Sequence, residues 1–343
     1  MIAAHSVVVL EKPRTKKLSE RGKPHLGLQL YATGESASRD SSRRRHPCYR
    51  QSVRQRYKVG VLSLRMRADG GTTIYHAIEP PMAYLDHWAL MEVAEGYAPQ
   101  FRAALKRRRG TLALSWVNFL ELSAVSERTA EPVKALLRDV FPQVALIQVE
   151  TGAVVRAEDD ILAGRRKTAA LLHDEWLDIY AGIRRRGNPN PLDPGEFVAV
   201  MQSTTMKSAF RRMLRQQRRE ILPLFAKARA QRNDAATSMR LKRPLPRLEG
   251  SVFSPTRFAF FEGMRYLIKN DLNLSSGNHL MDFWHTVVPI SYADYVLLDK
   301  NWKEAALQIQ RALQPKGLLT HHASVHADIP EFLWHLEHEV TYR

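Results

Sequence analysis

Short, mostly apolar runs alternate with amphipathic segments in two parts of the chain, residues 80–156 and 251–341. The runs have the length and continuity of strands that are buried on both faces of a parallel sheet. They lie at residues 82–86, 111–115, 144–149, 295–298 and 323–327. The segments between them carry apolar residues at helical spacing. Strands that alternate with helices predict an α/β fold, with a mainly parallel sheet covered by helices on both faces.

The pattern changes between residues 157 and 250, where helical, cationic sequence replaces the strands. Two helical patterns, at residues 169–186 and 206–232, are separated by the Pro-rich stretch 187–195. We interpret residues 157–250 as a helical insertion between two halves of one domain. Its basic clusters indicate phosphate contacts, although each cluster alone is also typical of a solvated helix face. The candidate nucleic-acid-binding residues are Arg184, Arg185, Arg186, Arg211, Arg212, Arg218 and Arg219.

The first 75 residues differ from the rest in being polar, basic and rich in serine. Such sequence buries too little apolar surface to offset its chain entropy, so we expect residues 1–75 to form a disordered, basic extension. Met66 offers an alternative start, and the sequence leaves open whether residues 1–65 belong to the native protein.

The net charge of the chain indicates which class of molecule it binds. The 343 residues include 52 Lys and Arg against 35 Asp and Glu, a formal charge of +17, which favours a polyanion. No window of 18 apolar residues occurs, so neither a membrane span nor a membrane partner is expected. The N-terminus lacks the basic start of a secretion signal, and the single cysteine, Cys48, cannot form an internal disulfide. These features predict a cytoplasmic protein.

Acidic residues recur at the ends of the predicted strands and inside the predicted helices. Asp86 ends the first strand, Asp294 and Asp299 flank the fourth, and Glu121 and Asp282 lie on helices. The carboxyl ends of parallel strands share one edge of a sheet, where open sheets place their ligands. Two like charges about 4 Å apart repel by roughly 4 kcal/mol at an effective dielectric of about 20, so a cluster there needs protons or a cation.

Each strand-end acid also has a structural interpretation. Asp86 and Asp299 stand where helix N-caps are expected. Caps do not explain Glu121 and Asp282, because an unpaired charge inside an apolar helix is unfavourable. Together the acids favour a hard cation, Mg²⁺ or Mn²⁺, held partly through water. Histidine pairs near the C-terminus have spacings found in zinc sites, but no cysteine joins them and we do not count them as a site.

The residues around these acids resemble the PIN-domain family of metal-dependent ribonucleases. The likeness spans about residues 80–150 and 255–340 and is carried by Tyr84-Leu85-Asp86, by residues 115–123 and by residues 278–300. It implies a three-layer α/β/α sandwich around a mainly parallel sheet, interrupted by the helical insertion. Where the family usually has Thr-Asn or Ser-Asn after the first Asp, this chain has His87-Trp88.

The resemblance also implies roles for individual residues. The catalytic, metal-binding acids would be Asp86, Glu121, Asp282 and Asp299, with Asp294 as an accessory metal ligand and with Ser115 and Asn118 in support. The implied activity is Mg²⁺- or Mn²⁺-dependent endonucleolytic cleavage of single-stranded or structured RNA.

The partners and the chemistry leave alternatives open. Many such domains are bacterial toxins neutralised by a partner protein, so the resemblance permits an antitoxin, and a homo-oligomer also stays open. The residues alone are also compatible with an inactive RNA-binding or regulatory module, in which the acids are caps, and with a DNA nuclease.

Overall fold

The computed structural model describes most of the chain from residue 72 onward and three short strands before it. The described residues are 5–10, 28–31, 62–66, 72–166, 169–172, 199, 202–230, 254–270, 277–319 and 322–339. Side chains are described from residue 78 onward, apart from some on the helices near residues 204–230 and 277–280.

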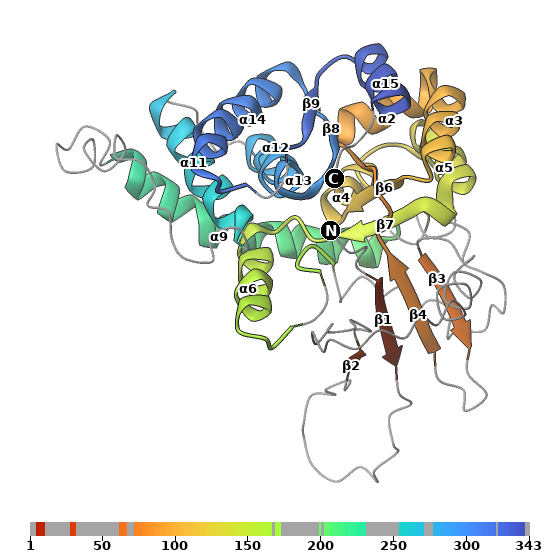
Figure 1. The fold of residues 1–343 in the computed structure, drawn as a ribbon, viewed down its shortest axis with the longest axis horizontal. Coiled ribbons are helices and arrows are strands. Elements are labelled where there is room, and N and C mark those ends of the chain that lie inside the picture. The colour runs from red at the N-terminus through yellow and green to blue at the C-terminus, as the bar shows by residue number, and fades with distance from the viewer. Residues whose placement is uncertain are drawn as a thin grey trace, which may run out of the picture.

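A five-stranded sheet in the order β7-β6-β5-β8-β9 forms the centre of the domain, and all its neighbouring strands pair in parallel (Figure 1). This confirms the predicted α/β fold with a mainly parallel sheet. The strands are β5 (Met82–Leu85), β6 (Thr111–Ser115), β7 (Val144–Ile147), β8 (Tyr295–Leu297) and β9 (Ser324–His326). Every residue of β5, β6, β7 and β8 is buried, which explains their unbroken apolar runs.

The helices fall into two groups that pack among themselves, one on each side of the sheet in Figure 1. The first group is α2 (His87–Gly96), α3 (Ala98–Arg108), α5 (Glu127–Val140) and α15 (Ile329–His338). The second is α6 (Thr151–Leu162), α11 (Pro255–Lys269), α12 (Gly277–Val287), α13 (Pro289–Tyr292) and α14 (Lys300–Leu313). Helix α4 (Trp116–Leu122) follows β6 directly and is almost entirely buried.

Aromatic residues join the helices of the second group to α4. Trp116 of α4 and Trp284 of α12 are both fully buried, with ring centroids 5.5 Å apart. Phe283 of α12 lies between Phe260 of α11 and Trp302 of α14, at centroid distances of 5.7 and 6.2 Å. Large buried rings contribute much of a core's packing energy. These contacts therefore fix α12 against α4, α11 and α14.

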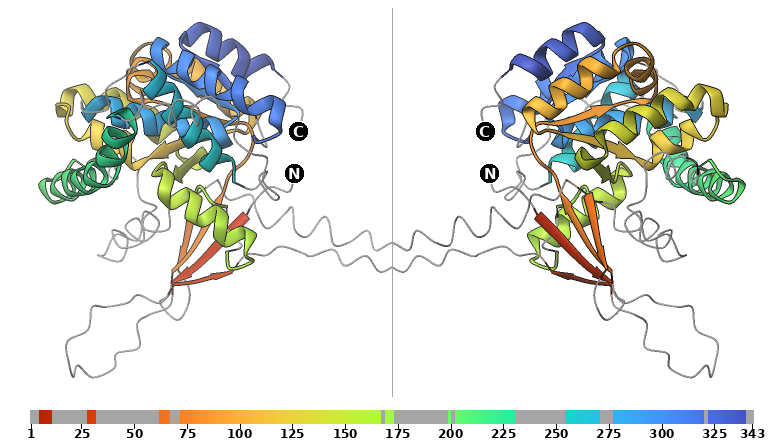
Figure 2. Two further views of the ribbon diagram at one scale, coloured as in Figure 1. Left: turned by 90° about the vertical axis from the view of Figure 1, so that its left-hand side faces the viewer. Right: turned by 90° about the vertical axis from the view of Figure 1, so that its right-hand side faces the viewer.

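The N-terminal region contains a second sheet, contrary to the predicted disorder of residues 1–75. Four antiparallel strands run in the order β2-β1-β4-β3, and Figure 2 shows them apart from the larger sheet. They are β1 (His5–Leu10), β2 (Leu28–Tyr31), β3 (Leu62–Met66) and β4 (Thr72–Ala77). The short β-branched runs Val-Val-Val-Leu and Thr-Thr-Ile-Tyr suit strands, but the basic composition around them outweighed this signal.

The predicted insertion is described in part. Its predicted start at residue 157 falls inside α6, which belongs to the domain core because Glu158 accepts hydrogen bonds from Thr256 N at 3.1 Å and Tyr292 Oη at 2.6 Å. Helix α9 (Thr204–Ala230) packs on α4 and α11, with Met206, Leu214 and Leu222 against the core. The predicted helix at 169–186 lies mostly outside the described residues. No described helix is both long and apolar enough to cross a membrane.

The packing of α11 on α12 depends on a glycine. A Cβ added at Gly263 would lie 2.8 Å from Cε2 of the buried Phe283, whereas one added at Gly96 meets nothing within 4 Å. We expect Gly263→Ala to destabilise the domain by about 1–2 kcal/mol, because overpacking of about 1–3 kcal/mol exceeds alanine's gain in helix propensity. Gly96→Ala, the matched helical control, should be neutral or stabilising. Urea unfolding of both variants tests this, and equal effects would contradict it.

Candidate functional site

The pairing of β5 with β8 brings Asp86 and Asp299 to one edge of the sheet. The chain moves from β5 through β6 to β7 on one side and then crosses to β8 on the other, so the strand order reverses at β5. Open α/β sheets bind ligands at the carboxyl ends of the strands at this reversal. Asp86 follows β5 and Asp299 follows β8 by two residues, and Asp86 Oδ2 accepts a hydrogen bond from Asp299 N at 3.1 Å.

Both strand-end acids also cap helices. Asp86 Oδ1 accepts from Ala89 N at 2.8 Å at the start of α2. Asp299 Oδ1 accepts from Asn301 N and Trp302 N, at 2.8 and 3.0 Å, at the start of α14. The structural interpretation of these two residues is therefore correct. It does not exclude a second role, because one carboxylate has about four acceptor sites.

Two further acids reach the same edge from helices α4 and α12. Glu121, near the end of α4, lies with Oε2 3.0 Å from Nε2 of His285 on α12. Asp282 is one turn before His285 on α12, and the Trp302 side chain hydrogen-bonds to its carboxylate. Asp282 interacts electrostatically with Glu121 and with Asp299. The structure thus brings together the four acids expected to be catalytic.

Burial among like charges perturbs the acids. Burial is the main reason that the pKa of Asp86 rises to about 7; the Ala89 and His285 contacts oppose it, and Glu121 and Asp299 add to it. Burial likewise raises the pKa of Asp282 to about 6, with further contributions from Asp299 and Glu121. Carboxyl groups with such values hold a proton near neutral pH unless a cation compensates them.

His285 is buried among the acids of this edge. Its side chain is 1% exposed. Burial alone would lower its pKa, but the charge and hydrogen bond of Glu121, together with Asp86 and Asp282, raise it. A buried imidazolium between carboxylates offsets part of their mutual repulsion.

A chain of hydrogen bonds supports the protonated form of His285. Nδ1 of His285 bonds Tyr84 Oη, which lies 3.2 Å from Ser115 Oγ. Ser115 Oγ donates to Asn118 Oδ1 at 3.0 Å, and Asn118 Nδ2 donates to the Leu85 carbonyl at 3.1 Å. Because Ser115 Oγ donates to Asn118, Tyr84 Oη can donate to Ser115 and accept from His285 Nδ1–H, while His285 Nε2 faces the carboxylate of Glu121. The arrangement accommodates a proton on each ring nitrogen.

Ser115 and Asn118 therefore have a structural place in the site. They form a capping box that begins α4, since Ser115 N donates to Asn118 Oδ1 at 2.9 Å and Asn118 N donates to Ser115 Oγ. Both residues are buried, so Asn118 does not face a cleft. Ser115 reaches Glu121 only through Tyr84 and His285.

Asp294 does not join the other acids, contrary to its predicted role as a metal ligand. Its Oδ2 accepts from Met82 N at 2.6 Å, and its N–H donates to the Met82 carbonyl at 2.9 Å. Met82 begins β5 and Asp294 precedes β8, so this pair lies at the amino ends of the two strands. Asp294 precedes β8 and Asp299 follows it, so the two acids lie at opposite edges of the sheet. Asp294 instead aligns the start of the β5–β8 pair.

His87 and Trp88 add two groups that the acids alone did not indicate. Burial lowers the pKa of His87; Glu121 opposes this shift and His285 adds to it, so its imidazole is neutral. Its Nδ1 is buried and has no hydrogen-bond partner among the described residues. The Trp88 side chain, one residue further along α2, is 42% exposed. An exposed aromatic ring is a surface on which a base can stack.

Three residues of this edge were missed as site members: Tyr84, His87 and His285. The signal for His285 was its position three residues after Asp282, which places both on one face of α12. Tyr84 carried no such signal in the sequence, because a tyrosine inside an apolar strand is predicted to be a core residue.

The donor set suits a hard cation held partly through water. All four acids offer oxygens, as Mg²⁺ and Mn²⁺ require, and Mg²⁺ commonly keeps several waters and only one or two carboxylates. Among the described residues, the four acids do not bring three ligand atoms close enough together to share one ion. Within that part of the chain, only His326, Glu331 and His335 do so. An ion at the acidic edge would thus be bound by one or two carboxylates directly and by the others through water.

A cavity of about 350 Å³ adjoins the acidic edge between α11, α12 and α14. Tyr266 and His279 line it, together with Lys300, Asn301 and Trp302 at the start of α14. Because the Trp302 side chain bonds Asp282, the cavity opens beside the acids. Its size is at the small end of those that hold small ligands.

The predicted arginines are only partly described. Arg211, Arg212, Arg218 and Arg219 lie on α9, where Arg218 is half-buried and the other three are exposed. Arg184, Arg185 and Arg186 lie outside the described residues. Residues 204–219 hold six basic residues and no acidic one. At about 3.6 residues per turn, these cations form one stripe along the helix. Gln202, just before α9, donates to the Leu122 carbonyl at 3.1 Å, which ties α9 to the end of α4 beside Glu121.

Comparison with protein-family models, with curated proteins and with solved structures found no match to this chain. The resemblance to PIN domains therefore rests on the sequence alone.

The raised pKa values predict how stability changes with pH. A group whose pKa is higher in the folded state stabilises most below its unfolded pKa, and this contribution disappears as pH rises through the folded pKa. For Asp282 that window runs from 3.8 to about 6. In chelator, Asp282→Asn should therefore equal the wild type near pH 4 and exceed its unfolding free energy by about 1–2 kcal/mol near pH 7.5, after allowance for solvent screening.

Urea unfolding at the two pH values measures this difference. Asp139→Asn on α5, an exposed acid that pairs with Arg102, is the control and should show no comparable growth with pH. An Asp282→Asn difference that stays constant from pH 4 to 7.5 would show that Asp282 titrates normally.

Proposed function

We propose that this chain is a Mg²⁺- or Mn²⁺-dependent endoribonuclease with a PIN-like three-layer α/β/α sandwich. The observation that carries the proposal is the convergence of Asp86, Glu121, Asp282 and Asp299 at the carboxyl edge of β5 and β8. The strand order, with β5 at its centre, and the helices on both sides support the sandwich.

The electrostatics support a cation-dependent reaction. The pKa values of Asp86 and Asp282 are raised to about 7 and about 6, so ionising both carboxyl groups beside Glu121 and Asp299 is unfavourable without a compensating cation. When bound, a divalent ion would offset this charge, lower the pKa of a water and stabilise the phosphoryl oxygens during in-line displacement. The ion would be held by Asp86, Asp282 and Asp299, with Glu121 kept in place by His285.

Side chains of the protein would position the RNA and accept the proton of the attacking water. Water attacks phosphorus and the bond to the leaving oxygen breaks, which requires one group to take a proton near the attacking water. His87 is neutral and adjoins the acids, so it is the described base best suited to that step. Trp88 offers a stacking face to an unpaired base, which favours single-stranded RNA as substrate.

The basic stripe of α9 supports a nucleic-acid substrate. Its arginines extend from the end of α4, which carries Glu121, so a backbone bound along α9 can lead to the acids. Phosphate contacts of this kind supply affinity without sequence preference.

A second candidate is an RNA-binding module without hydrolytic activity. The capping contacts of Asp86 and Asp299 favour it, because they give both carboxylates a structural role at the starts of α2 and α14. RNA binding alone does not separate the two candidates, but metal-dependent cleavage does.

Cleavage of a mixed RNA pool tests the nuclease. We expect cleavage with Mg²⁺ or Mn²⁺ and none in chelator. Asp282→Asn and Asp299→Asn should each slow cleavage about 100-fold or more, since they remove several kcal/mol of transition-state stabilisation, and should still bind RNA. A DNA pool of the same sequences, run in parallel, distinguishes an RNA nuclease from a DNA nuclease.

The capping role calls for a matched control. Asp328 caps α15 as Asp299 caps α14, and asparagine caps as well as aspartate, so Asp328→Asn makes the same chemical change at a strand-end cap that is not one of the four acids. It should leave cleavage unchanged. If wild-type protein binds RNA but never cuts, or if all three variants cut equally, the acids are structural and the binding module replaces the nuclease.

The α9 stripe predicts a salt effect. Changing Arg211, Arg212 and Arg219 together to glutamine should weaken RNA binding and reduce the slope of log affinity against log salt by about 0.7 for each phosphate that is no longer neutralised, or about 2 in all. Cleavage at saturating RNA should persist. Fluorescence anisotropy over a range of salt concentrations measures the slope.

A charge-matched control uses three arginines of the opposite helix group. Arg107, Arg128 and Arg138, changed together to glutamine, remove the same charge from α3 and α5. If this variant lowers the slope as much as the α9 variant does, net charge and not the stripe governs binding.

A further inference from the structure

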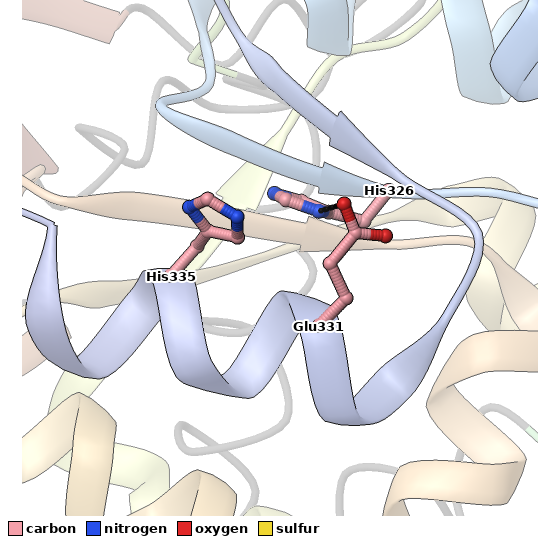
Figure 3. A group of neighbouring side chains, drawn as sticks. All are labelled: His326, Glu331 and His335. Atoms are coloured by element: carbon pink, nitrogen blue, oxygen red, sulfur yellow. Dashed lines mark ion pairs between the residues drawn. The ribbon is translucent and has the colours of Figure 1, made fainter.

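A second group of metal-ligating side chains lies where β9 meets α15. His326 ends β9, and Glu331 and His335 lie one turn apart on α15 (Figure 3). One ligand atom from each of the three lies within 4.8 Å of the others. The group is separate from the acids of the proposed nuclease and does not depend on that proposal.

The backbone holds both elements in fixed positions. His326 pairs with Leu297 of β8, and its carbonyl accepts from Leu298 N at 3.0 Å. Asp328 caps α15 by accepting from Glu331 N at 2.8 Å. Phe332, on the buried face of α15, packs edge-on against the His326 ring at a centroid distance of 5.9 Å. The three side chains are therefore placed by the fold and not by a mobile loop.

His326 presents an unsatisfied nitrogen to the group. Its side chain is 3% exposed, and Nδ1 is buried with no hydrogen-bond partner among the described residues. The nearest carboxylate oxygen, Glu331 Oε1, lies 3.5 Å from it. Two ligands at about 2.0–2.1 Å from a tetrahedral ion are roughly 3.3 Å apart, so this separation already approaches that of ligands on one ion.

Outer contacts orient all three ligands. Nε2 of His326 lies 2.9 Å from Ser324 Oγ, and an Nε2–H that donates there leaves the lone pair on Nδ1. Nδ1 of His335 lies 3.4 Å from Glu339 Oε2, which leaves Nε2 for the ion. Lys303 contacts the other oxygen of Glu331, Oε2, at 3.5 Å. Metal-binding histidines usually donate their second N–H to such a partner.

We propose that His326 Nδ1, Glu331 and His335 Nε2 bind one divalent transition metal ion, with Zn²⁺ as the best fit. Two imidazoles and one carboxylate are ligands typical of Zn²⁺ and not of Mg²⁺, which takes oxygens. The Glu331 side chain is 44% exposed and that of His335 is 30% exposed, so water has access to a fourth position. The site links β9 to α15.

The sequence alone pairs these histidines differently. Spacing suggests His322 with His326 and His335 with His338, whereas the fold joins His326 to His335 and adds Glu331. His338 bonds the Trp334 carbonyl and its ring stacks on Trp334, away from the group.

Zinc content and cobalt spectroscopy of the full chain test the proposal. Protein stripped with chelator and dialysed against limiting Zn²⁺ should retain one ion per chain, unaffected by millimolar Mg²⁺. Co²⁺ should give visible absorption bands typical of four-coordinate binding, and Zn²⁺ should displace it. Glu331→Gln and His335→Gln change partly exposed residues and should weaken binding by more than the roughly 10–100-fold that follows removal of a hydrogen-bond partner of a ligand.

Two matched variants complete the experiment. His338→Gln removes a neighbouring histidine of α15, and Asp282→Asn alters the acidic edge; both should bind Zn²⁺ as the wild type does. The thermal unfolding temperature should rise with Zn²⁺ for the wild type and for these two controls, but not for Glu331→Gln or His335→Gln. Absence of Zn²⁺ binding by the wild type, or equal binding by all four variants, would overturn the proposal.

Discussion

The parallel register between β5 and β8 is the constraint on which the rest of the site depends. It pairs Ala83 with Tyr295 and Leu85 with Leu297, so residues more than 200 positions apart end their strands together. Asp294 fixes one end of this pair through Met82, and Asp86 fixes the other through Asp299 N. A shift of one residue would turn every side chain of β8 to the other face. Asp86 therefore both holds the register and contributes to the charge of the carboxyl edge.

That charge makes His285 important. A cluster of carboxylates inside a protein is unfavourable unless protons or cations accompany it. Here Asp86 and Asp282 retain protons to higher pH, and His285 gains one through Glu121. The hydrogen bonds that link His285 to Tyr84 and Tyr84 to Ser115 give the proton on His285 defined partners. Protons on the carboxyl groups and on His285, or an added cation, can therefore each balance the negative charge of this edge.

The sequence predicted those parts of the structure that depend on local pattern. The five strand positions follow from continuous apolar runs, and Asp86 and Asp299 follow from the rule that ligands gather at strand ends. The prediction that Asp294 is a metal ligand was wrong because Asp294 precedes β8 and so lies at the sheet edge opposite Asp86 and Asp299. Only the strand register reveals this. The N-terminal strands were hidden by basic composition. The partnership of His326 with His335 depends on the packing of β9 against α15, and sequence spacing carries no information about it.

The two candidate cation sites differ in ways that would keep their ions apart. The four acids of the edge offer oxygens, spread widely enough that water must complete any coordination shell, which suits an ion that loses its water reluctantly. The group at β9 and α15 offers two imidazoles and one carboxylate, already oriented by Ser324, Glu339 and Lys303. Nitrogen ligands favour transition metals over Mg²⁺, so millimolar Mg²⁺ would not compete there. Donor chemistry, more than position, is therefore the reason that we propose a different ion for each of the two sites, which lie along the same end of the sheet.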